Sequence, residues 1–360
     1  MINLNIERNE KGFYVLDEES LKGFERTHNV NQYSGEIDDS FWLTQGDTKI
    51  LVKTSENPSY MMSLYSEILF AQFAEKNNIP CAEIDVGIYE GKPVLISKSV
   101  ASKDSELISY TKLEELLGSE IKNNTVANIK DTICSNVDKL NESYEDKIKV
   151  SSNIYNNLLV IATLDFLVSQ GDRHPGNILF EVSNVDGIKE LNVASMFDNE
   201  ASFGFMEVRA FYDEHPEYFD KIFSGENTDI EQFRTFFDKY VKENFLDVRP
   251  MLGVVAATDY DCHENLQDKM PEYGDGRYAS FVNKIVCADI VMEMMKKPKF
   301  SSFCAGLEFD AATLAQEIEM ETEGFKIPPQ FVDLAQNMFN QKFKQLEEAM
   351  KKYSGKEMGE

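Results

Sequence analysis

The sequence predicts an α+β protein of two lobes, a small β-rich lobe with one helix and a larger α-helical lobe. Its 360 residues exceed the size at which one hydrophobic core usually keeps growing, so two packed lobes are expected. Short apolar runs of strand length fill the first hundred residues, whereas apolar residues at helical spacing dominate the remainder. We therefore place the N-terminal lobe at residues 1–100 and the C-terminal lobe at residues 101–360.

Five short apolar runs, separated by Gly, Asn or Asp, indicate strands in the N-terminal lobe. Residues 45–47 and 90–92 each contain a glycine and are typical of hairpin turns. One helix is predicted over residues 59–77, because Tyr65, Leu69 and Phe73 recur at helical spacing. The predicted strands contain residues 13–16, 41–43, 50–52, 84–89 and 94–96.

The C-terminal lobe begins a mainly helical pattern after residue 104. Two strand-like apolar runs, 178–180 and 191–197, interrupt it and predict a hairpin inside the helical lobe. The polar stretch 118–149 is the nearest thing to a linker in the chain. The expected helices span residues 107–117, 151–169, 230–244, 279–295, 311–321 and 329–353.

The composition argues against several classes of function. No apolar stretch is long enough to cross a bilayer, so a membrane-embedded protein is not expected. A net charge of −27 disfavours direct binding to nucleic acid or to an anionic membrane surface, because affinity for either rests largely on Lys and Arg. Five scattered cysteines lack metal-ligand spacing, and residues 1–10 lack the continuous apolar run of a secretory signal. We therefore expect a cytoplasmic protein with reduced thiols.

The most informative stretch is the segment 169–180, which follows a predicted helix and precedes a predicted strand. It places Asp172 and Asn177 five positions apart, so a loop can turn both side chains toward one centre. Asp198 comes directly after the next strand-like run. A loop acid, an amide and a second acid, in this order, are what a metal-dependent phosphoryl-transfer site requires.

The N-terminal lobe supplies the other parts of such a site. Lys53 ends a predicted strand and Glu67 lies on the following helix, so an ion pair between them could hold Lys53 against nucleotide phosphates. The segment 33–40 stands where a phosphate-binding loop would precede the lysine strand, with Ser34 and Gly35 as its candidate contacts. It contains one glycine and no full glycine-rich motif.

Together these residues resemble the HipA-like bacterial serine/threonine kinases and, more distantly, the phosphatidylinositol 3- and 4-kinases, which share an Asp-Arg-His-x-x-Asn loop. The resemblance is strongest over residues 41–100 and 158–203. It implies a protein-kinase-like fold that binds ATP and Mg²⁺ between its lobes. By the same resemblance, Asp172 would be the catalytic base, and Asn177 and Asp198 would be magnesium ligands.

The resemblance also implies roles for the neighbouring residues. Lys53 would contact the phosphates with Glu67 as its partner, while Arg173 and His174 would brace the loop from inside. Ser34 stands where some kinases of this kind phosphorylate themselves. A protein substrate, such as a component of translation, and an antitoxin partner would follow from the toxin members of the family. Longer members carry an extra N-terminal β subdomain, for which this sequence is too short before Lys53.

Two other interpretations stay open at this point. The loop around Asp172 also resembles that of antibiotic phosphotransferases and inositol-lipid kinases, which favours a small-molecule or lipid kinase, although the acidity of the chain argues against a lipid surface. The weak phosphate loop favours instead a pseudokinase that binds a nucleotide, or nothing, and acts as an interaction module. Turnover of ATP distinguishes these alternatives.

Overall fold

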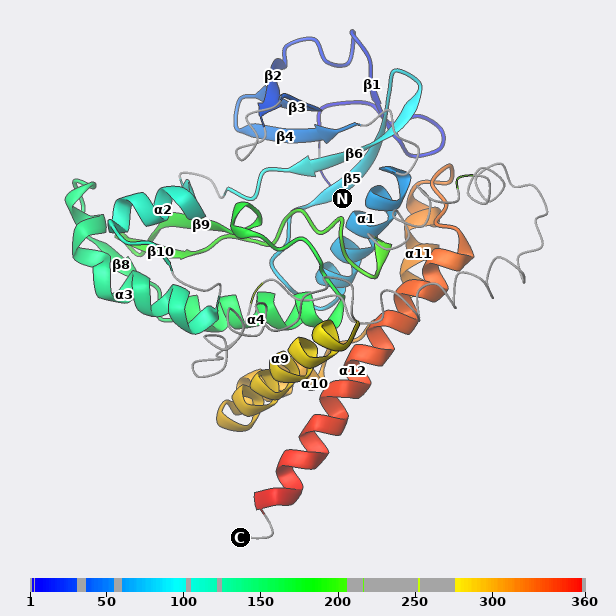
Figure 1. Cartoon of the computed structure of the whole chain (residues 1–360). Helices are drawn as coiled ribbons and strands as arrows, with labels where there is room; N and C mark the ends of the chain where they lie inside the picture. Colours follow the sequence, from blue (N-terminus) through cyan, green and yellow to red (C-terminus); the bar gives the residue numbers. More distant parts are fainter. Residues whose placement is uncertain are drawn as a thin grey trace.

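A computed structural model describes residues 2, 4–30, 37–54, 60–101, 105–121, 125–205, 216, 252 and 276–357. Within them, a β-rich N-terminal region stands above a mainly helical C-terminal region (Figure 1). The predicted α+β class, with one helix embedded in the β-rich part, is confirmed. The helix expected over 230–244, and Ser34 and Gly35 of the candidate phosphate loop, lie outside the described residues.

The N-terminal region is a six-stranded sheet with strand order β1-β5-β6-β4-β3-β2. Strand β1 pairs in parallel with β5, and the other neighbours pair antiparallel. Both predicted turns are present, with Gly46 and Gly91 at positive φ (58° and 77°), a conformation that glycine adopts without steric cost. The strands are β1 (Tyr14–Leu16), β2 (Glu25–Val30), β3 (Ile37–Gln45), β4 (Thr48–Lys53), β5 (Ile84–Tyr89) and β6 (Lys92–Lys98).

A second sheet, with strand order β7-β9-β10-β8, lies in the region of three corrected sequence predictions. The expected hairpin is β9 (Leu179–Val185) and β10 (Ile188–Val193), but two further strands extend it. The stretch 118–149 is no linker, since it holds helix α3 (Val126–Glu142) and strand β8 (Ile148–Val150). The helix expected from 107 is α2 (Tyr110–Leu117), because residues 106–109 form β7 (Glu106–Ser109).

Local chemistry explains the start of α2 and the presence of α3. Ser109 ends β7 and caps α2, since its side chain accepts a hydrogen bond from Lys112 N, so the helix begins only after it. Helix α3 is polar over most of its surface but buries a stripe of apolar side chains at helical spacing. The buried stripe of α3 consists of Val126, Ile129, Ile133 and Leu140.

The remaining helices agree closely with the sequence predictions. Helix α4 (Ile154–Leu167) leads into the loop that contains Asp172, and the one-turn helix η1 (Pro175–Asn177) ends that loop. Three of the four C-terminal helices were predicted, and α10 was not. They are α9 (Gly276–Lys296), α10 (Pro298–Ala305), α11 (Ala311–Glu321) and α12 (Pro329–Glu357). No helix within the described residues is both long and apolar enough to span a membrane.

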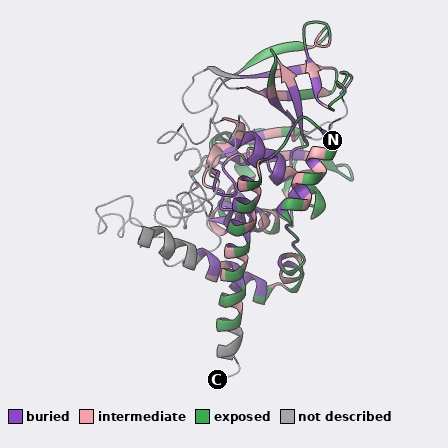
Figure 2. Cartoon of the chain, turned by 90° about the vertical axis from the view of Figure 1, so that its right-hand side faces the viewer, coloured by how far each residue is buried: buried purple, intermediate pink, exposed green. Residues whose placement is uncertain are grey.

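Helix α1 (Tyr60–Lys76) lies between the six-stranded sheet and the C-terminal helices. On the side of the C-terminal helices, the rings of Tyr65 and Phe325 are 5.4 Å apart, and those of Phe73 and Phe309 are 5.3 Å apart. At its end, Asn77 forms two hydrogen bonds of 2.9 Å with the backbone of Glu308. Buried residues are concentrated where these parts meet, whereas α12 becomes exposed toward the C-terminus (Figure 2). The fold therefore holds α1 from two sides.

The N-terminal turn also contacts the C-terminal helices. Gly12 has φ 86°, and a Cβ atom added there would lie 2.3 Å from the carbonyl oxygen of Glu321 and 3.2 Å from Thr322 Cα. Gly12 therefore permits a close approach of two backbones that any side chain would prevent. This contact joins the turn before β1 to the end of α11.

We expect Gly12→Ala to destabilise the protein more than Gly91→Ala does. Both glycines have positive φ, so both variants lose about 1–2 kcal/mol to backbone strain. Only Gly12 meets a neighbouring backbone, which should add about 1–3 kcal/mol to the loss. Urea unfolding of the two variants measures the difference, and equal midpoints would contradict the close approach.

Candidate active site

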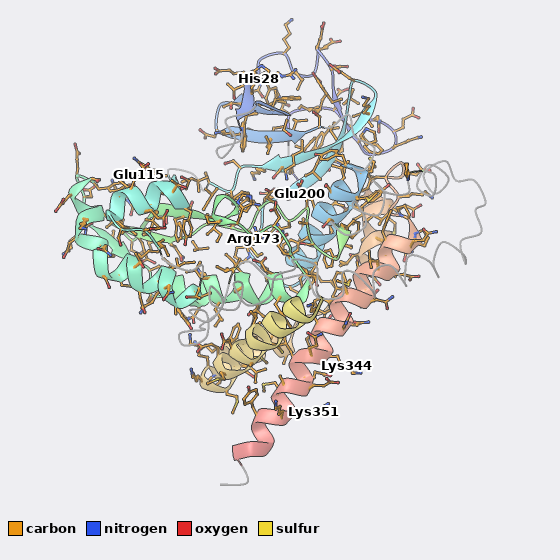
Figure 3. The ribbon with its side chains drawn as sticks, viewed as in Figure 1. His28, Glu115, Arg173, Glu200, Lys344 and Lys351 are labelled. Atoms are coloured by element: carbon orange, nitrogen blue, oxygen red, sulfur yellow. The ribbon has the colours of Figure 1, made fainter. Side chains whose placement is uncertain are left out.

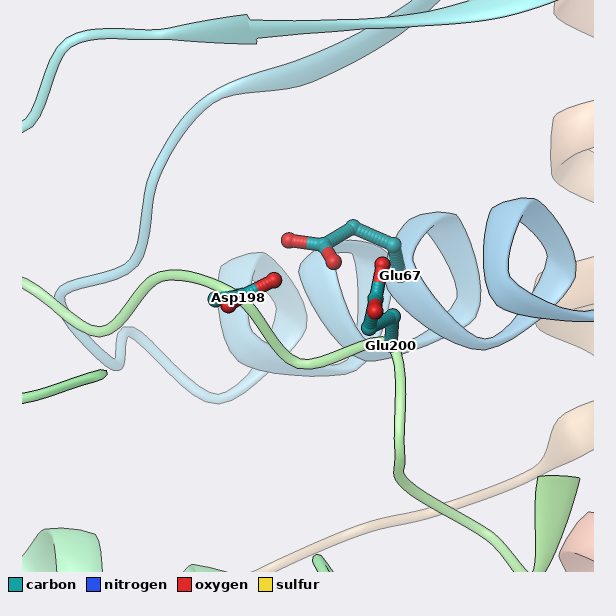
Figure 4. A group of neighbouring side chains, drawn as sticks. All are labelled: Glu67, Asp198 and Glu200. Atoms are coloured by element: carbon teal, nitrogen blue, oxygen red, sulfur yellow. The ribbon is translucent and has the colours of Figure 1, made fainter. Parts of the chain in front are cut away.

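Lys53 lies among three carboxylates that come from distant parts of the chain. Its Nζ is 2.7 Å from Asp198 Oδ1, 3.3 Å from Glu67 Oε2 and 3.6 Å from Glu200 Oε2. Lys53 ends β4, Glu67 lies on α1, and the other two acids follow β10. Figure 4 shows the three acidic side chains converging from α1 and from the segment after β10.

The charges in this cluster act strongly on one another because Lys53 and Glu67 are largely buried, at 13 % and 2 % exposed. Burial lowers the pKa of Lys53, but Asp198, Glu67 and Glu200 outweigh it, so the pKa lies well above its ordinary value. Burial raises the pKa of Asp198, yet Lys53 reverses this and holds it below the ordinary value. Burial raises the pKa of Glu200 to about 7, with Asp198 and Glu67 adding to the effect and Lys53 opposing it. One lysine thus faces more negative charge than it can neutralise.

The loop between α4 and β9 carries Asp172 and Asn177. Asn177 is buried and donates a hydrogen bond of 2.8 Å from Nδ2 to the carbonyl oxygen of Asp172. The carboxylate of Asp172 is 41 % exposed and lies 3.9 Å from Nε2 of His174, so it remains accessible to a substrate. His174 is partly exposed, and its Nδ1 accepts a hydrogen bond from Gly176 N. It therefore stabilises the turn into η1.

Arg173 occupies the centre of the site, below Glu200 in Figure 3. Its guanidinium is 1 % exposed and pairs with the fully buried carboxylate of Asp165 on α4 at 3.2 Å. Nη1 also donates to the carbonyl oxygens of Asn177 and Phe197, at 3.1 Å and 2.7 Å. Nη2 donates to Oδ1 of Asn199 at 2.5 Å. Arg173 therefore joins the Asp172 loop to the segment that contains Asp198.

Two further contacts attach the Asp198 segment to the N-terminal region. Met196 forms backbone hydrogen bonds with Pro80 and Ala82, at 3.0 Å and 2.7 Å, just after α1. Ser66, the neighbour of Glu67, is fully buried, and its Oγ lies 3.0 Å from the carbonyl oxygen of Asn199. The segments that carry Glu67 and Asp198 are therefore joined by the Ser66 side chain and by backbone bonds just after α1.

The structure brings most of the predicted site residues together. Lys53, Glu67 and Asp198 meet directly, and Asp172 and Asn177 join them through their shared loop and Arg173. Of the predicted bracing residues, Arg173 is internal, whereas His174 is at the surface of the loop.

Glu200 and Gln170 are among the residues of the site that were not singled out from the sequence. The only signal for Glu200 was a second acid two positions after Asp198. Carboxylate oxygens of Glu67, Asp198 and Glu200 lie within 4.8 Å of one another, which suits a hard divalent cation. Gln170 shows no signal in the sequence, because its contacts are with backbone groups.

Comparisons with known proteins return similar solved structures at low sequence identity. No family model and no curated protein matches the chain. A crystal structure of the Helicobacter pylori proinflammatory kinase CtkA is similar with a TM-score of 0.47 and 14 % identity, over 90 % of this chain and 95 % of that one. The Shewanella oneidensis MR-1 toxin–antitoxin system HipA, HipB and its operator DNA complex is similar with a TM-score of 0.35 and 9 % identity, over 98 % and 70 % of the two chains. The HipA-like resemblance expected from the sequence is thus accompanied by a similarity to solved structures, which assigns no activity to this chain.

We expect Lys53→Met to destabilise the protein by about 3 kcal/mol, because it leaves three carboxylates without their shared cation. Lys98→Met is the matched control, since Lys98 pairs with Glu83 where both side chains are nearly half exposed (44 % and 46 %). That variant should change stability by about 0.5 kcal/mol or less. Denaturant unfolding distinguishes the two, and similar losses would contradict the strong coupling within the Lys53 cluster.

Proposed function

We propose that the protein is an ATP- and Mg²⁺-dependent phosphotransferase, a serine/threonine protein kinase of the HipA-like kind. The observation that carries this proposal is the contact of Lys53 Nζ with both Glu67 and Asp198, at 3.3 Å and 2.7 Å. A strand lysine, a helix glutamate and an acid after a hairpin meet in this way in phosphoryl-transfer sites of the protein-kinase type. The division into lobes at residues 1–100 and 101–360 is part of the proposal.

The residues present fit a magnesium ion bound with the nucleotide. All candidate ligands are oxygens, as hard cations require, and one lysine leaves the acidic cluster with excess negative charge. We assign Asn177 and Asp198 as the ligands, with Glu200 close enough to assist. Magnesium would supply neutralisation of the phosphate charge. Lys53, held by Glu67, would add a fixed positive charge beside the phosphates.

Asp172 is proposed as the catalytic base. Its carboxylate is partly exposed, so an acceptor hydroxyl can reach it, and the loop fixes its backbone through Asn177. Burial raises the pKa of Asp172, His174 opposes this, and Asp198 adds to it. A raised pKa favours acceptance of a proton from the hydroxyl during transfer.

The acceptor, the partner and the location of the protein are also proposals. A protein serine or threonine is the proposed acceptor, with a component of translation as a candidate, and an antitoxin as a possible partner in the HipA-like scheme. Direct binding to nucleic acid or membrane is disfavoured by the charge of −27. The free thiols of Cys81, Cys134, Cys287 and Cys304 support a cytoplasmic location.

Incubation with γ-labelled ATP and magnesium tests the function. Wild type should transfer label to protein, and mass spectrometry locates the phosphosites, including Ser34 if it is modified. We expect Asp172→Asn to lower transfer about 100- to 10,000-fold while nucleotide binding persists, because only the base is lost. Asp198→Asn should instead weaken magnesium-dependent nucleotide binding, because a metal ligand is lost.

The control for these variants is Asp186→Asn, in the exposed turn between β9 and β10. Asn tolerates the positive φ of 52° at this position, so activity and stability should stay at the wild-type level. Nucleotide binding without label transfer in wild type would favour a small-molecule acceptor or a pseudokinase. Full activity of Asp172→Asn would refute the assigned base.

A further inference from the structure

The side chain of Gln170 connects the two acids of the site through their backbones. It is fully buried, and both ends of its amide are hydrogen-bonded. Oε1 accepts from the backbone N–H of Asp172 at 2.9 Å, and Nε2 donates to the carbonyl oxygen of Asp198 at 3.2 Å. Only this orientation of the amide satisfies both partners, because an N–H group can only donate and a carbonyl oxygen can only accept.

Asp198 needs such support because its backbone has φ 54°, in the left-handed region. A residue other than glycine keeps this conformation only where its surroundings hold it. The carbonyl oxygens on both sides of its Cα atom accept hydrogen bonds. The carbonyl of Phe197 accepts from Arg173 at 2.7 Å, and the carbonyl of Asp198 accepts from Gln170. The direction of the Asp198 side chain is therefore set by two donors from the Asp172 loop.

Gln170 is itself fixed by the end of α4. Its backbone N–H donates a hydrogen bond of 2.8 Å to the carbonyl oxygen of Asp165. The carboxylate of the same residue, Asp165, pairs with Arg173. Gln170 and Arg173 stand on either side of Asp172 in the sequence, and both are anchored at Asp165. The same anchor thus positions the loop that carries Asp172 and the strained turn that carries Asp198.

We propose that Gln170 is a positioning residue that sets the distance between Asp172 and Asp198 for phosphoryl transfer. This inference rests on the proposed function. The amide of Gln170 is occupied by backbone groups, so it acts through the two acids and does not itself contact the reacting groups. Phosphoryl transfer depends mainly on positioning and charge, and a displacement of about 1 Å can lower turnover about 100-fold.

The test compares Gln170→Met with Thr163→Val. Methionine has a similar length but makes neither hydrogen bond, so the Asp172 and Asp198 backbones lose their connection. Thr163→Val removes a single buried hydrogen bond of 2.8 Å within α4, away from both acids. Gln170→Asn is a second variant, since it keeps the amide but is one methylene too short to reach both partners. Each protein is assayed for kcat, for KM toward Mg·ATP, for thermal stability and for hydrogen exchange at the Asp172 amide.

Gln170→Met is expected to lower kcat about 100-fold with a smaller change in KM, and to speed exchange of the Asp172 amide. Gln170→Asn should also lower kcat, but by less than Gln170→Met does. Thr163→Val should reduce thermal stability and leave kcat unchanged, which separates positioning from a general loss of stability. If both Gln170 variants kept the kcat of Thr163→Val, the positioning role would be overturned, and the proposed function would stand. A wild type that transfers no phosphate would overturn the proposed function and this role with it.

Discussion

The ion pair between Lys53 and Asp198 is the contact on which the rest of the site depends. It joins the last residue of β4 to the segment after β10, 145 positions further along the chain, at 2.7 Å. Such a pair is favourable in a water-poor site only if other hydrogen bonds hold both partners in place, because the desolvation of two charges is costly. Glu67 supplies this support on the lysine side, and the backbone contacts of the Asp198 segment supply it on the other.

Helix α1 provides the rigid frame for this contact. It is packed against the six-stranded sheet on one side, and its aromatic residues Tyr65 and Phe73 pack against rings of α12 on the other. Ser66 then bonds the helix to the carbonyl of Asn199, one residue after Asp198. A movement of α1 that displaced Glu67 would break aromatic packing and this buried hydrogen bond together. The fold therefore favours an assembled arrangement of Lys53, Glu67 and Asp198.

Much of the fold and the site could be predicted from the sequence, because apolar periodicity and the order of acidic residues are local patterns. Strand β2 was missed because it is an edge strand of mostly polar residues, so burial imposed little apolar pattern on it. Helix α3 was missed because its narrow apolar stripe is diluted by polar residues. Gln170 was missed for a different reason. Its role comes from bonds to backbone groups that only the three-dimensional fold brings near it, and such bonds leave no sequence pattern.

The excess of negative charge in the site also links metal binding to nucleotide binding under the proposed function. Glu67, Asp198 and Glu200 face one lysine, in a chain whose net charge is −27. A nucleotide triphosphate is itself an anion, so this site would repel it in the absence of a cation. Asp198 would hold the divalent ion in this scheme, and Lys53 could then pair with phosphate oxygens instead of with the carboxylate. Under the proposed function, the acidity of the site would therefore be compatible with a nucleotide only if the metal and the nucleotide bind together.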